Sequence, residues 1–497
     1  MARMEHVFGA LGTTQLVCLV SALALALGFE FVNGFHDTAN AVATVIYTHS
    51  LPPWLAVVWS GIWNLLGVLR STGGVAFAIV SLLPVELVMN VGSAAGFAMV
   101  FSLLTSAILW NLGTWYLGLP ASSSHTLIGS IMGVGLMNSL ITTGSVRGGI
   151  NWSKAEEVGL SLLVSPVVGF VGTAILFLLI KALIHKPELY SEPDPKKAPP
   201  LWIRGTLCLT CTGVSYMHGS NDGQKGIGLL MLILVGIVPG IYALDLSTTG
   251  DSIHQLTVMS QGATAILQKH AGGQPLDMNT ANTTLAAYIK SDGTFSENVY
   301  PALAEKSDEI ASTLADKKSV AVLSEDQRKA LRNAIYFTSE TIGKLSKSHT
   351  LSNDEDAILT KFKDALDKTI KFIPVWVKFA VAIALGFGTM IGWKRIVVTV
   401  GEKIGKSHLT YAQGASAEAI AMITIGLADT YGMPVSTTHV LSSGVAGAMA
   451  ANKSGLQTAT LRNLLLAWVL TLPVCVFLGA GFFAGGLRLM ARVFGLH

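Results

Sequence analysis

Charged side chains are scarce in this chain. Of its 497 residues, 13% are Asp, Glu, Lys or Arg, whereas an ordinary soluble protein carries about 25%. The shortage excludes a water-soluble globular protein, because most of the side chains do not suit contact with water. A net charge of +3, dispersed along the chain, also excludes a basic surface for nucleic acid.

Cysteine is rare as well. The four cysteines lie in apolar segments, and Cys208 and Cys211 form a C-x-x-C pair. On a helix this spacing simply places both residues on one face, and no redox-fold pattern surrounds it. We interpret the cysteines as packing residues, and we expect no cofactor.

Long apolar stretches are what the chain has in abundance. A membrane-spanning helix needs roughly 20 such residues. Suitable stretches cover residues 13–33, 54–83, 93–117, 158–184, 205–238, 373–392, 409–430 and 460–490. The first is not a signal peptide, because Glu30, His36 and Asp37 stand where a small-residue cleavage site should be. We expect an all-α polytopic protein of the lipid bilayer, with about 10 to 12 membrane-embedded segments.

The sequence repeats itself. Residues 118–126 read GLPASSSHT and residues 432–440 read GMPVSTTHV, with Gly, Pro, Ser and His in the same places and Ser or Thr at two more. A second, weaker pair matches Gly34-Phe35-His36-Asp37 with Gly219-Ser220-Asn221-Asp222. Two matched pairs in the same order indicate two related halves.

The second half carries an insertion. Asp37 precedes Gly118 by 81 residues, whereas Asp222 precedes Gly432 by 210. Prolines at similar distances after each aspartate locate the extra residues just after Pro239. The predicted organisation is a first membrane repeat at 1–186, a linker at 187–200, the start of the second repeat at 201–239, the insertion at 240–372, and the remainder of the second repeat at 373–497.

The insertion has the character of a small, soluble helical domain. Residues 244–372 hold 31 of the 63 charged residues of the chain. Capping boxes are formed by Ser324-x-x-Gln327 and Ser352-x-x-Glu355. A helical apolar stripe is formed by Leu359, Phe362, Leu366 and Ile370. Residues 244–296 are rich in Thr, Gly, Asn and Ser, and we expect a loop there.

Basic residues indicate the orientation of the chain. They cluster in two short loops, at residues 181–204 and 394–406, which the positive-inside rule assigns to the cytoplasm. The linker at 187–200 is then cytoplasmic and the insertion lies on the outer, periplasmic face. An odd number of crossings in each half gives two inverted repeats, with about five to six membrane segments each.

The repeated Gly-x-Pro motif predicts a re-entrant hairpin in each half. Proline removes a backbone donor and glycine loosens the turn, and non-helical backbone inside a membrane must line protein or water. With Pro120 and Pro434 near the first turn of the next half-helix, exposed N–H groups and hydroxyls form an anion cradle. The hydroxyls are those of Ser122, Ser123, Ser124, Ser436, Thr437 and Thr438. A single hydroxyl more often only packs a helix, but two matched triplets favour an anion site.

Asp37 and Asp222 lie in apolar surroundings, where a charge costs at least about 2.5 to 3.5 kcal/mol. Their matched positions favour a functional pair over a structural one. Beside an anion, carboxylates can hold a coupling cation, carry a proton, or accept the hydrogen of a protonated phosphate, which sulfate lacks. The sequence leaves these three roles open.

Asn40 and Lys225 follow Asp37 and Asp222 by three residues, which makes them candidates for the anion site. Lys225 has the alternative of extending its ammonium group to a membrane interface. Glu418, in the apolar stretch 409–430, is a further candidate for the coupling-ion site.

His125 and His439 close the two hydroxyl motifs, and His36 and His218 precede the two aspartates. Histidines in matched places can relay protons near neutral pH. Their other role is structural, as hydrogen-bonded supports of the binding residues, and we expect this role for His125 and His439.

At these motifs the chain resembles the Pit family of inorganic phosphate transporters, the bacterial low-affinity permeases in particular. The matching stretches are residues 33–41, 118–126, 218–226 and 432–439. The resemblance implies an inverted-repeat fold with two re-entrant hairpins, phosphate bound by the hairpin Ser and Thr residues, and coupling to a cation. It also implies a place in the inner membrane, protons as the coupling partner, and phosphate accepted together with a divalent metal ion.

One departure from the family concerns the coupling ion. Sodium-coupled relatives commonly have Glu in the second helix, where this chain has Asn64. The missing carboxylate disfavours sodium and favours protons, and Asn64 is then expected to support the site rather than to bind the ion.

Three alternatives stay open at this point. Sulfate, another tetrahedral oxyanion, also suits helix ends and hydroxyls. An intramembrane hydrolase would use Ser, His and Asp, but the duplicated hydroxyls and the missing nucleophile elbow argue against an enzyme. A channel also uses re-entrant hairpins. The sequence does not decide affinity, stoichiometry, homo-oligomeric state or the role of the insertion.

Overall fold

The computed structural model describes residues 12–37, 39–83, 87–88, 91–194, 196–272, 276–290, 293–348, 351–493 and 495. Every regular element within these ranges is a helix, and a single isolated bridge joins Gly405 to Leu456. The expected all-α fold is confirmed.

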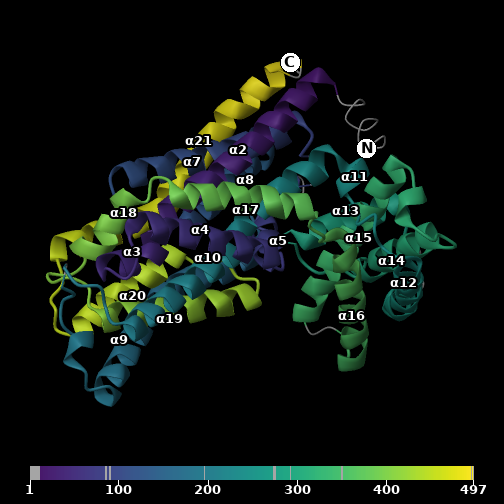
Figure 1. Cartoon of the computed structure of the whole chain (residues 1–497). Coiled ribbons are helices and arrows are strands. Elements are labelled where there is room, and N and C mark those ends of the chain that lie inside the picture. The colour runs from purple at the N-terminus through teal and green to yellow at the C-terminus, as the bar shows by residue number, and fades with distance from the viewer. Residues whose placement is uncertain are drawn as a thin grey trace.

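The first half contributes the helices up to residue 183 (Figure 1). They are α2 (Thr13–Asp37), α3 (Ala39–Tyr47), α4 (Pro53–Arg70), α5 (Gly74–Val80), α7 (Ala94–Tyr116), α8 (Ser123–Thr143) and α9 (Trp152–Leu183). A short 3-10 turn, η1 (Pro187–Leu189), follows in the linker. Asp37 is the last described residue of α2.

The second half begins with the longest helix and continues after the insertion. Its helices are α10 (Leu201–Ile237), α17 (Val375–Met390), α18 (Lys394–Val398), α19 (Tyr411–Thr430), α20 (Thr437–Ala451) and α21 (Thr458–Val493), with the π-turn η3 (Thr399–Lys403) after α18. Asp222 lies in the middle of α10, within an unbroken helix of 37 residues.

The two halves exchange packing partners. Helix α8 of the first half packs on α21 of the second, and α20 of the second packs on α9 of the first. In the same way α2 packs on α17, and α10 packs on α4. Each half therefore buries its apolar faces against the other, and neither is a separate body.

Fewer helices suit a simple crossing than the sequence predicts. Five are long and apolar enough to span a membrane, or up to seven if each of two bent helix pairs is one span. Within the described residues, α17 and α20 are short, with 16 and 15 residues. Helix α10 is long enough, but it carries Asp222, Gln224 and Lys225 in its centre. The expected 10 to 12 membrane-embedded segments thus include helices that do not qualify as spans by length and composition.

Residues 239–370 form a group of helices at one end of the membrane bundle (Figure 1). They are α11 (Pro239–Tyr242), α12 (Gly250–His270), α13 (Met278–Ile289), α14 (Val299–Leu314), η2 (Val320–Val322), α15 (Glu325–Ser348) and α16 (Asn353–Ile370). Their buried apolar side chains make a core of their own, which runs from Ala243 to Ile370. Both predicted capping boxes are present, and the stripe from Leu359 to Ile370 is buried.

The prediction of a loop at residues 244–296 is wrong. Helices α12 and α13 occupy most of it. The side chains of Thr249 and Asp277 cap their N-termini, so part of the Thr- and Asn-rich composition belongs to helix starts. Leu256, Ala263 and Leu267 face the core of the insertion at helical spacing.

Candidate functional site

The two repeated motifs form the same turn in both halves. Gly118 and Gly432 adopt left-handed φ angles of 66° and 64°, a conformation that glycine adopts without steric strain. The amide of the following residue closes the helix end: Leu119 N donates to Thr114 O at 2.9 Å, and Met433 N donates to Ala428 O at 2.8 Å. This helix-end motif makes the chain reverse after α7 and after α19.

Each turn ends in a serine that caps the next helix. The Ser122 hydroxyl accepts from His125 N at 3.3 Å, and the Ser436 hydroxyl accepts from His439 N at 3.1 Å. Helices α8 and α20 therefore begin three residues after the prolines, later than the first-turn position considered from the sequence. The first serine of each triplet stabilises a helix start, and the next two residues lie in the first turn.

Hydroxyls from both halves bind one carboxylate. Ser123 Oγ of α8 donates to Asp37 Oδ2 at 2.7 Å, and Thr438 Oγ1 of α20 donates to Asp37 Oδ1 at 2.6 Å. Asp37 is 1% exposed. Its negative charge lies at the N-terminal ends of α8 and α20, where the helix dipole favours an anion.

Lys225 connects this carboxylate to the second aspartate motif. Its ammonium group donates to Ser123 Oγ at 2.9 Å and lies 2.8 Å from Asp222 Oδ2. Lys225 is completely buried, so its side chain does not extend to a membrane interface. Lys225, Asp37 and Asp222 thus form one buried cluster. Without the neighbouring histidines, the formal charge of this cluster is negative.

Asp37, His218 and Asp222 each bring one potential ligand atom to a common place. These atoms lie within 4.8 Å of one another. Two carboxylates and one imidazole suit a divalent cation. The Lys225 ammonium group beside Asp222 competes with such an ion, so metal binding at this place requires Lys225 to move.

Asn64 determines how His218 faces Asp222. The amide of Asn64 donates to Ser60 O at 3.0 Å, which turns its oxygen toward His218 Nδ1 at 2.6 Å. Nδ1 is therefore the donor, and a neutral ring then turns a lone pair on Nε2 toward Asp222 Oδ2, 3.3 Å away. The same Asp222 oxygen also lies 2.8 Å from the Lys225 ammonium group.

His36 stands in a matching relation to Asp37. Its Nε2 lies 3.1 Å from the Thr114 hydroxyl, whose hydrogen is directed to the backbone carbonyl of Trp110 at 2.9 Å. Nε2 is therefore the donor, and Nδ1 faces Asp37 Oδ1 at 3.3 Å. Each half thus contains a buried His–Asp pair with its nearest nitrogen and oxygen 3.3 Å apart.

The hairpins also contact each other. The rings of His125 and His439 are 4.6 Å apart, and His439 stacks on Trp468 at 4.2 Å. Ser124 Oγ donates to Val435 O of the other hairpin at 2.9 Å. His125, His439 and Ser124 hold the two turns together, while Ser123 and Thr438 reach the charged cluster. Thr437 is buried in the first turn of α20.

Two predicted site residues are not part of this cluster as described. Glu418 accepts a hydrogen bond from Thr210 of α10, and Thr210 precedes Asp222 by 12 residues, which is about 18 Å along a helix. The backbone of Asn40 lies in α3, and its side chain lies outside the described residues.

Two acids near the cluster, one buried and one half-buried, were not predicted as site residues. Glu30 is completely buried, and Asn33 Nδ2 donates to its Oε2 at 3.3 Å; it packs against Gly226, the residue after Lys225. Asp429 accepts from Ser220 at 2.7 Å and from Gln224 at 2.6 Å. An acid in an apolar stretch is itself a signal for function, and it would have singled out both.

Charged groups buried among apolar helices, supplied by distant parts of the chain, define an integral membrane transporter. The comparisons with known proteins specify which one. The phosphate transporter family matches residues 33–479, and the chain belongs to that family.

Individual relatives agree with this assignment. The low-affinity inorganic phosphate transporter PitA of Escherichia coli K12 is 45% identical, over 97% of this chain and 99% of the relative. PitB of the same strain is 44% identical, over 98% and 100%. A probable low-affinity inorganic phosphate transporter of Bacillus subtilis is 27% identical, over 94% and 96%. A solved sodium-dependent phosphate transporter shares the fold, with a TM-score of 0.52 and 20% identity over 95% and 99% of the two chains.

The family resemblance seen in the sequence is thus confirmed. The protein is a multi-pass transporter of the inner membrane and not an enzyme, so the hydrolase alternative is wrong. Its relatives are named as transporters over nearly their whole length.

Proposed function

We propose that this protein carries inorganic phosphate into the cell by proton-coupled alternating access, with one binding site between the α7–α8 and α19–α20 hairpins. The observation that supports it most is the pair of hydrogen bonds from Ser123 and Thr438 to Asp37. Two halves of the chain direct hydroxyls and helix N-termini at one negatively charged group. An oxyanion that replaces the Asp37 carboxylate there meets the same donors.

The residues around Asp37 suit phosphate better than sulfate. Ser123, Thr438 and Lys225 supply donors for the unprotonated oxygens of the anion. At neutral pH phosphate retains a P–OH group, and a carboxylate such as that of Asp222 accepts its hydrogen. Sulfate has no such hydrogen, so the carboxylates of Asp37 and Asp222 would only repel a sulfate ion at this place.

The exchanged packing of the two halves supports alternating access. Helix α8 packs on α21 and helix α9 packs on α20, so these four helices, two from each half, can rock together and carry both hairpins with them. Ser161 Oγ of α9 also donates to Pro434 O, and Trp468 Nε1 of α21 to Pro120 O, each at 3.0 Å. Two inverted repeats, with the insertion outside and the linker inside, are the arrangement we infer.

Protons are the coupling ions that the site favours. The pairs His36–Asp37 and His218–Asp222 are buried and each brings an imidazole within 3.3 Å of a carboxylate, and such side chains can carry a proton. Asn64 supplies no carboxylate for sodium and instead orients His218. A phosphate bound as a metal complex is a second cargo, because Asp37, His218 and Asp222 can ligate a divalent ion once Lys225 moves.

The test is uptake of radiolabelled phosphate into proteoliposomes with an alkaline interior. We expect saturable uptake that the pH gradient drives, that arsenate inhibits and that sulfate does not. Ser123→Ala and Thr438→Ala should each abolish most of the uptake, whereas Ser252→Ala, a hydroxyl of the insertion, should not. Uptake that follows sodium and ignores pH would overturn the coupling, and ohmic currents without saturation would indicate a channel.

A further inference from the structure

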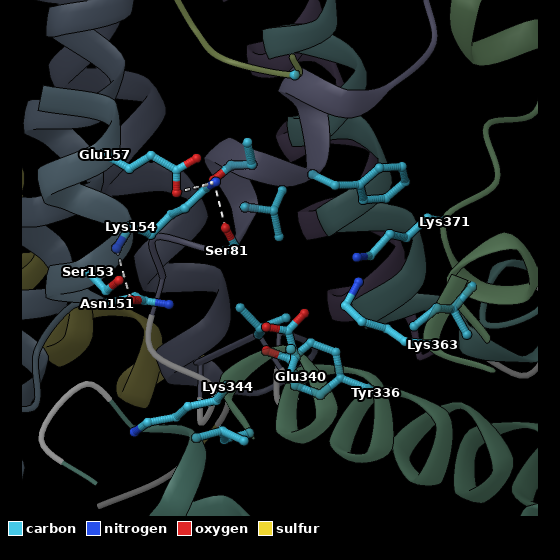
Figure 2. Close-up of a pocket in the computed structure, with 18 of the residues that line it drawn as sticks. Ser81, Asn151, Ser153, Lys154, Glu157, Tyr336, Glu340, Lys344, Lys363 and Lys371 are labelled. Carbon is cyan, nitrogen blue, oxygen red and sulfur yellow. Dashed lines mark hydrogen bonds and ion pairs between the residues drawn. The ribbon is translucent and has the colours of Figure 1, made fainter. Parts of the chain in front are cut away.

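A cavity lies between the insertion and the membrane helices, outside the hairpin site. It has a volume of about 860 Å³, enough for several hydrated small ions. Its walls come from α5, α9, α10 and the end of α19 on the membrane side, and from α13, α15 and α16 on the insertion side. Figure 2 shows Lys154 and Glu157 on one wall and Tyr336, Glu340, Lys363 and Lys371 on the opposite walls.

The lining of this cavity is strongly basic. Its described residues include seven lysines and arginines but only two acids, Glu157 and Glu340. Two of these cations already have partners: Lys154 lies 3.0 Å from Glu157 Oε2, and Lys344 donates to three backbone carbonyls. The membrane side of the lining, in contrast, is largely apolar, with Phe77, Met231 and Val235 among its members. A basic wall above a low-dielectric floor concentrates anions.

Lys363 and Lys371 are oriented toward the cavity by an acid behind them. Both ammonium groups lie 2.8 Å from Asp367 Oδ2, and Asp367 itself does not line the cavity among the described residues. Burial would raise the pKa of Asp367, but Lys371 and Lys363 hold it below its ordinary value. Burial would likewise lower the pKa of Lys363, but Asp367 raises it. Two lysines and one carboxylate give this wall one formal net positive charge.

The cavity reaches the hairpin that the proposed phosphate site uses. Tyr431 and Gly432, at the start of the second turn, belong to its lining. The next residue, Met433, accepts a hydrogen bond from Asn221 at 3.1 Å, and Asn221 precedes Asp222. The same turn therefore borders the basic cavity on one side and the buried Asp37–Asp222 cluster on the other.

We propose that the insertion is an anion-collecting vestibule, which concentrates free inorganic phosphate in front of the second hairpin. Lysines suit this role, because their hydrated point charges attract an anion without the bidentate grip of arginine. The vestibule assigns the insertion a function and a ligand class, and it rests on the proposed transport of phosphate.

The test compares two charge-matched double variants. Lys347→Gln/Lys371→Gln removes two cations from the cavity lining. Lys361→Gln/Lys368→Gln removes two exposed cations of α16 that are not part of the described lining. Uptake is measured in phosphatidylcholine proteoliposomes at ionic strengths of about 0.01 M and 0.3 M, which span Debye lengths from about 30 Å to well under 10 Å.

At low ionic strength we expect the lining variant to raise the KM for phosphate about three- to tenfold, with an unchanged maximal rate. The difference should disappear at high ionic strength, the control should match wild type, and Lys347→Arg/Lys371→Arg should restore the KM. An unchanged KM in the lining variant, or an equal rise in the control, would overturn the vestibule.

Two further arms keep the result unambiguous. The wild-type KM should itself rise with ionic strength, which tests the vestibule even if a glutamine variant does not fold. A lipid phosphate headgroup is the other ligand that these lysines could bind, and vesicles with added phosphatidylglycerol test it. If the lysine variants change uptake only in these vesicles, the cavity binds lipid headgroups and the proposal is refuted. Absence of wild-type phosphate uptake would refute the transport function, whereas uptake with a salt-independent KM refutes the vestibule alone.

Discussion

The membrane bundle and the insertion each contain a lysine–aspartate pair, and the two pairs have the same length but different surroundings. Lys225 lies 2.8 Å from Asp222, and both side chains are completely buried. Lys363 lies 2.8 Å from Asp367, and these side chains are 25% and 17% exposed. Water can replace the partner in the second pair but not in the first.

This difference separates a pair whose loss leaves an uncompensated buried charge from one whose loss water can compensate. Removing one member of a fully buried pair leaves an uncompensated charge, at a cost of about 3 to 5 kcal/mol. A partly exposed pair is worth about 1 kcal/mol or less. The fully buried pair, Lys225 and Asp222, lies beside the hairpin hydroxyls. This is where a transporter needs a charge that an anion can contact.

The largest effect should follow from Lys225→Met. Asp222 then remains buried without its cation, and Ser123 loses one of its charged partners, so we expect phosphate uptake to fall by about 100-fold or more and unfolding to become easier by about 3 to 5 kcal/mol. Initial uptake rates and thermal unfolding in detergent measure the two effects.

The comparison requires two controls. Lys225→Met/Asp222→Asn should recover much of the stability but not the uptake, because the buried charge is gone while the anion site stays incomplete. Lys363→Met should retain uptake at saturating phosphate. Equal losses of uptake and stability in Lys225→Met and Lys363→Met would contradict the distinction between the two regions.

Smaller effects should follow from alanine at the turn glycines. A left-handed residue with a Cβ costs about 1 to 2 kcal/mol, so Gly118→Ala and Gly432→Ala should lose stability by this amount. They should also reduce uptake several-fold, because each turn positions a hydroxyl on Asp37. Gly272→Ala, at a φ of 62° in the insertion, should show the same loss of stability with normal uptake. Reduced uptake in all three variants would show that strain alone explains it.

The smallest effect concerns the pH dependence of the insertion. Burial raises the pKa of Asp367, but the effect of Lys371 and Lys363 is opposite and larger. The pKa of Asp367 in the folded protein therefore lies below its ordinary value. Its stabilisation is therefore present above an unfolded pKa of about 3.9 and is lost as the pH falls through the folded value. Asp367→Asn should speed hydrogen–deuterium exchange in α16 at pH 7, and the difference from wild type should shrink toward pH 3. A difference that grows in acid would contradict this sign.

The sequence predicts the parts of the fold that depend on neighbouring residues. The glycine, proline and serine of each repeat define a helix end, a turn and a cap within nine positions, and both turns form as this chemistry demands. The capping box at Ser352 and the stripe through Phe362 are equally local. The helices over residues 250–289 were missed, because Thr and Asn serve as caps and exposed helix positions as readily as loop residues.

The sequence indicates the residue types around Asp37, but it does not say which hydroxyl makes which contact. Six matched hydroxyls looked equivalent, yet Ser122 and Ser436 cap helices, Ser124 bonds a backbone carbonyl, and Ser123 and Thr438 bind Asp37. Glu418 looked like a member of the ion site, but it lies with Thr210, far along α10 from Asp222. Distances across helices depend on how the two halves pack, which no local pattern contains.

The sequence by itself determined that this protein belongs in a membrane, that two polar motifs each occur twice along it, and that a charged segment separates the second pair of motifs. These properties follow from composition and from short-range backbone chemistry. Only the tertiary structure decided which hydroxyls meet at Asp37, that Lys225 is buried between two aspartates, and that the lysines of the insertion line a cavity beside Gly432. Burial and charge pairing arise when residues hundreds of positions apart exclude water from a common space.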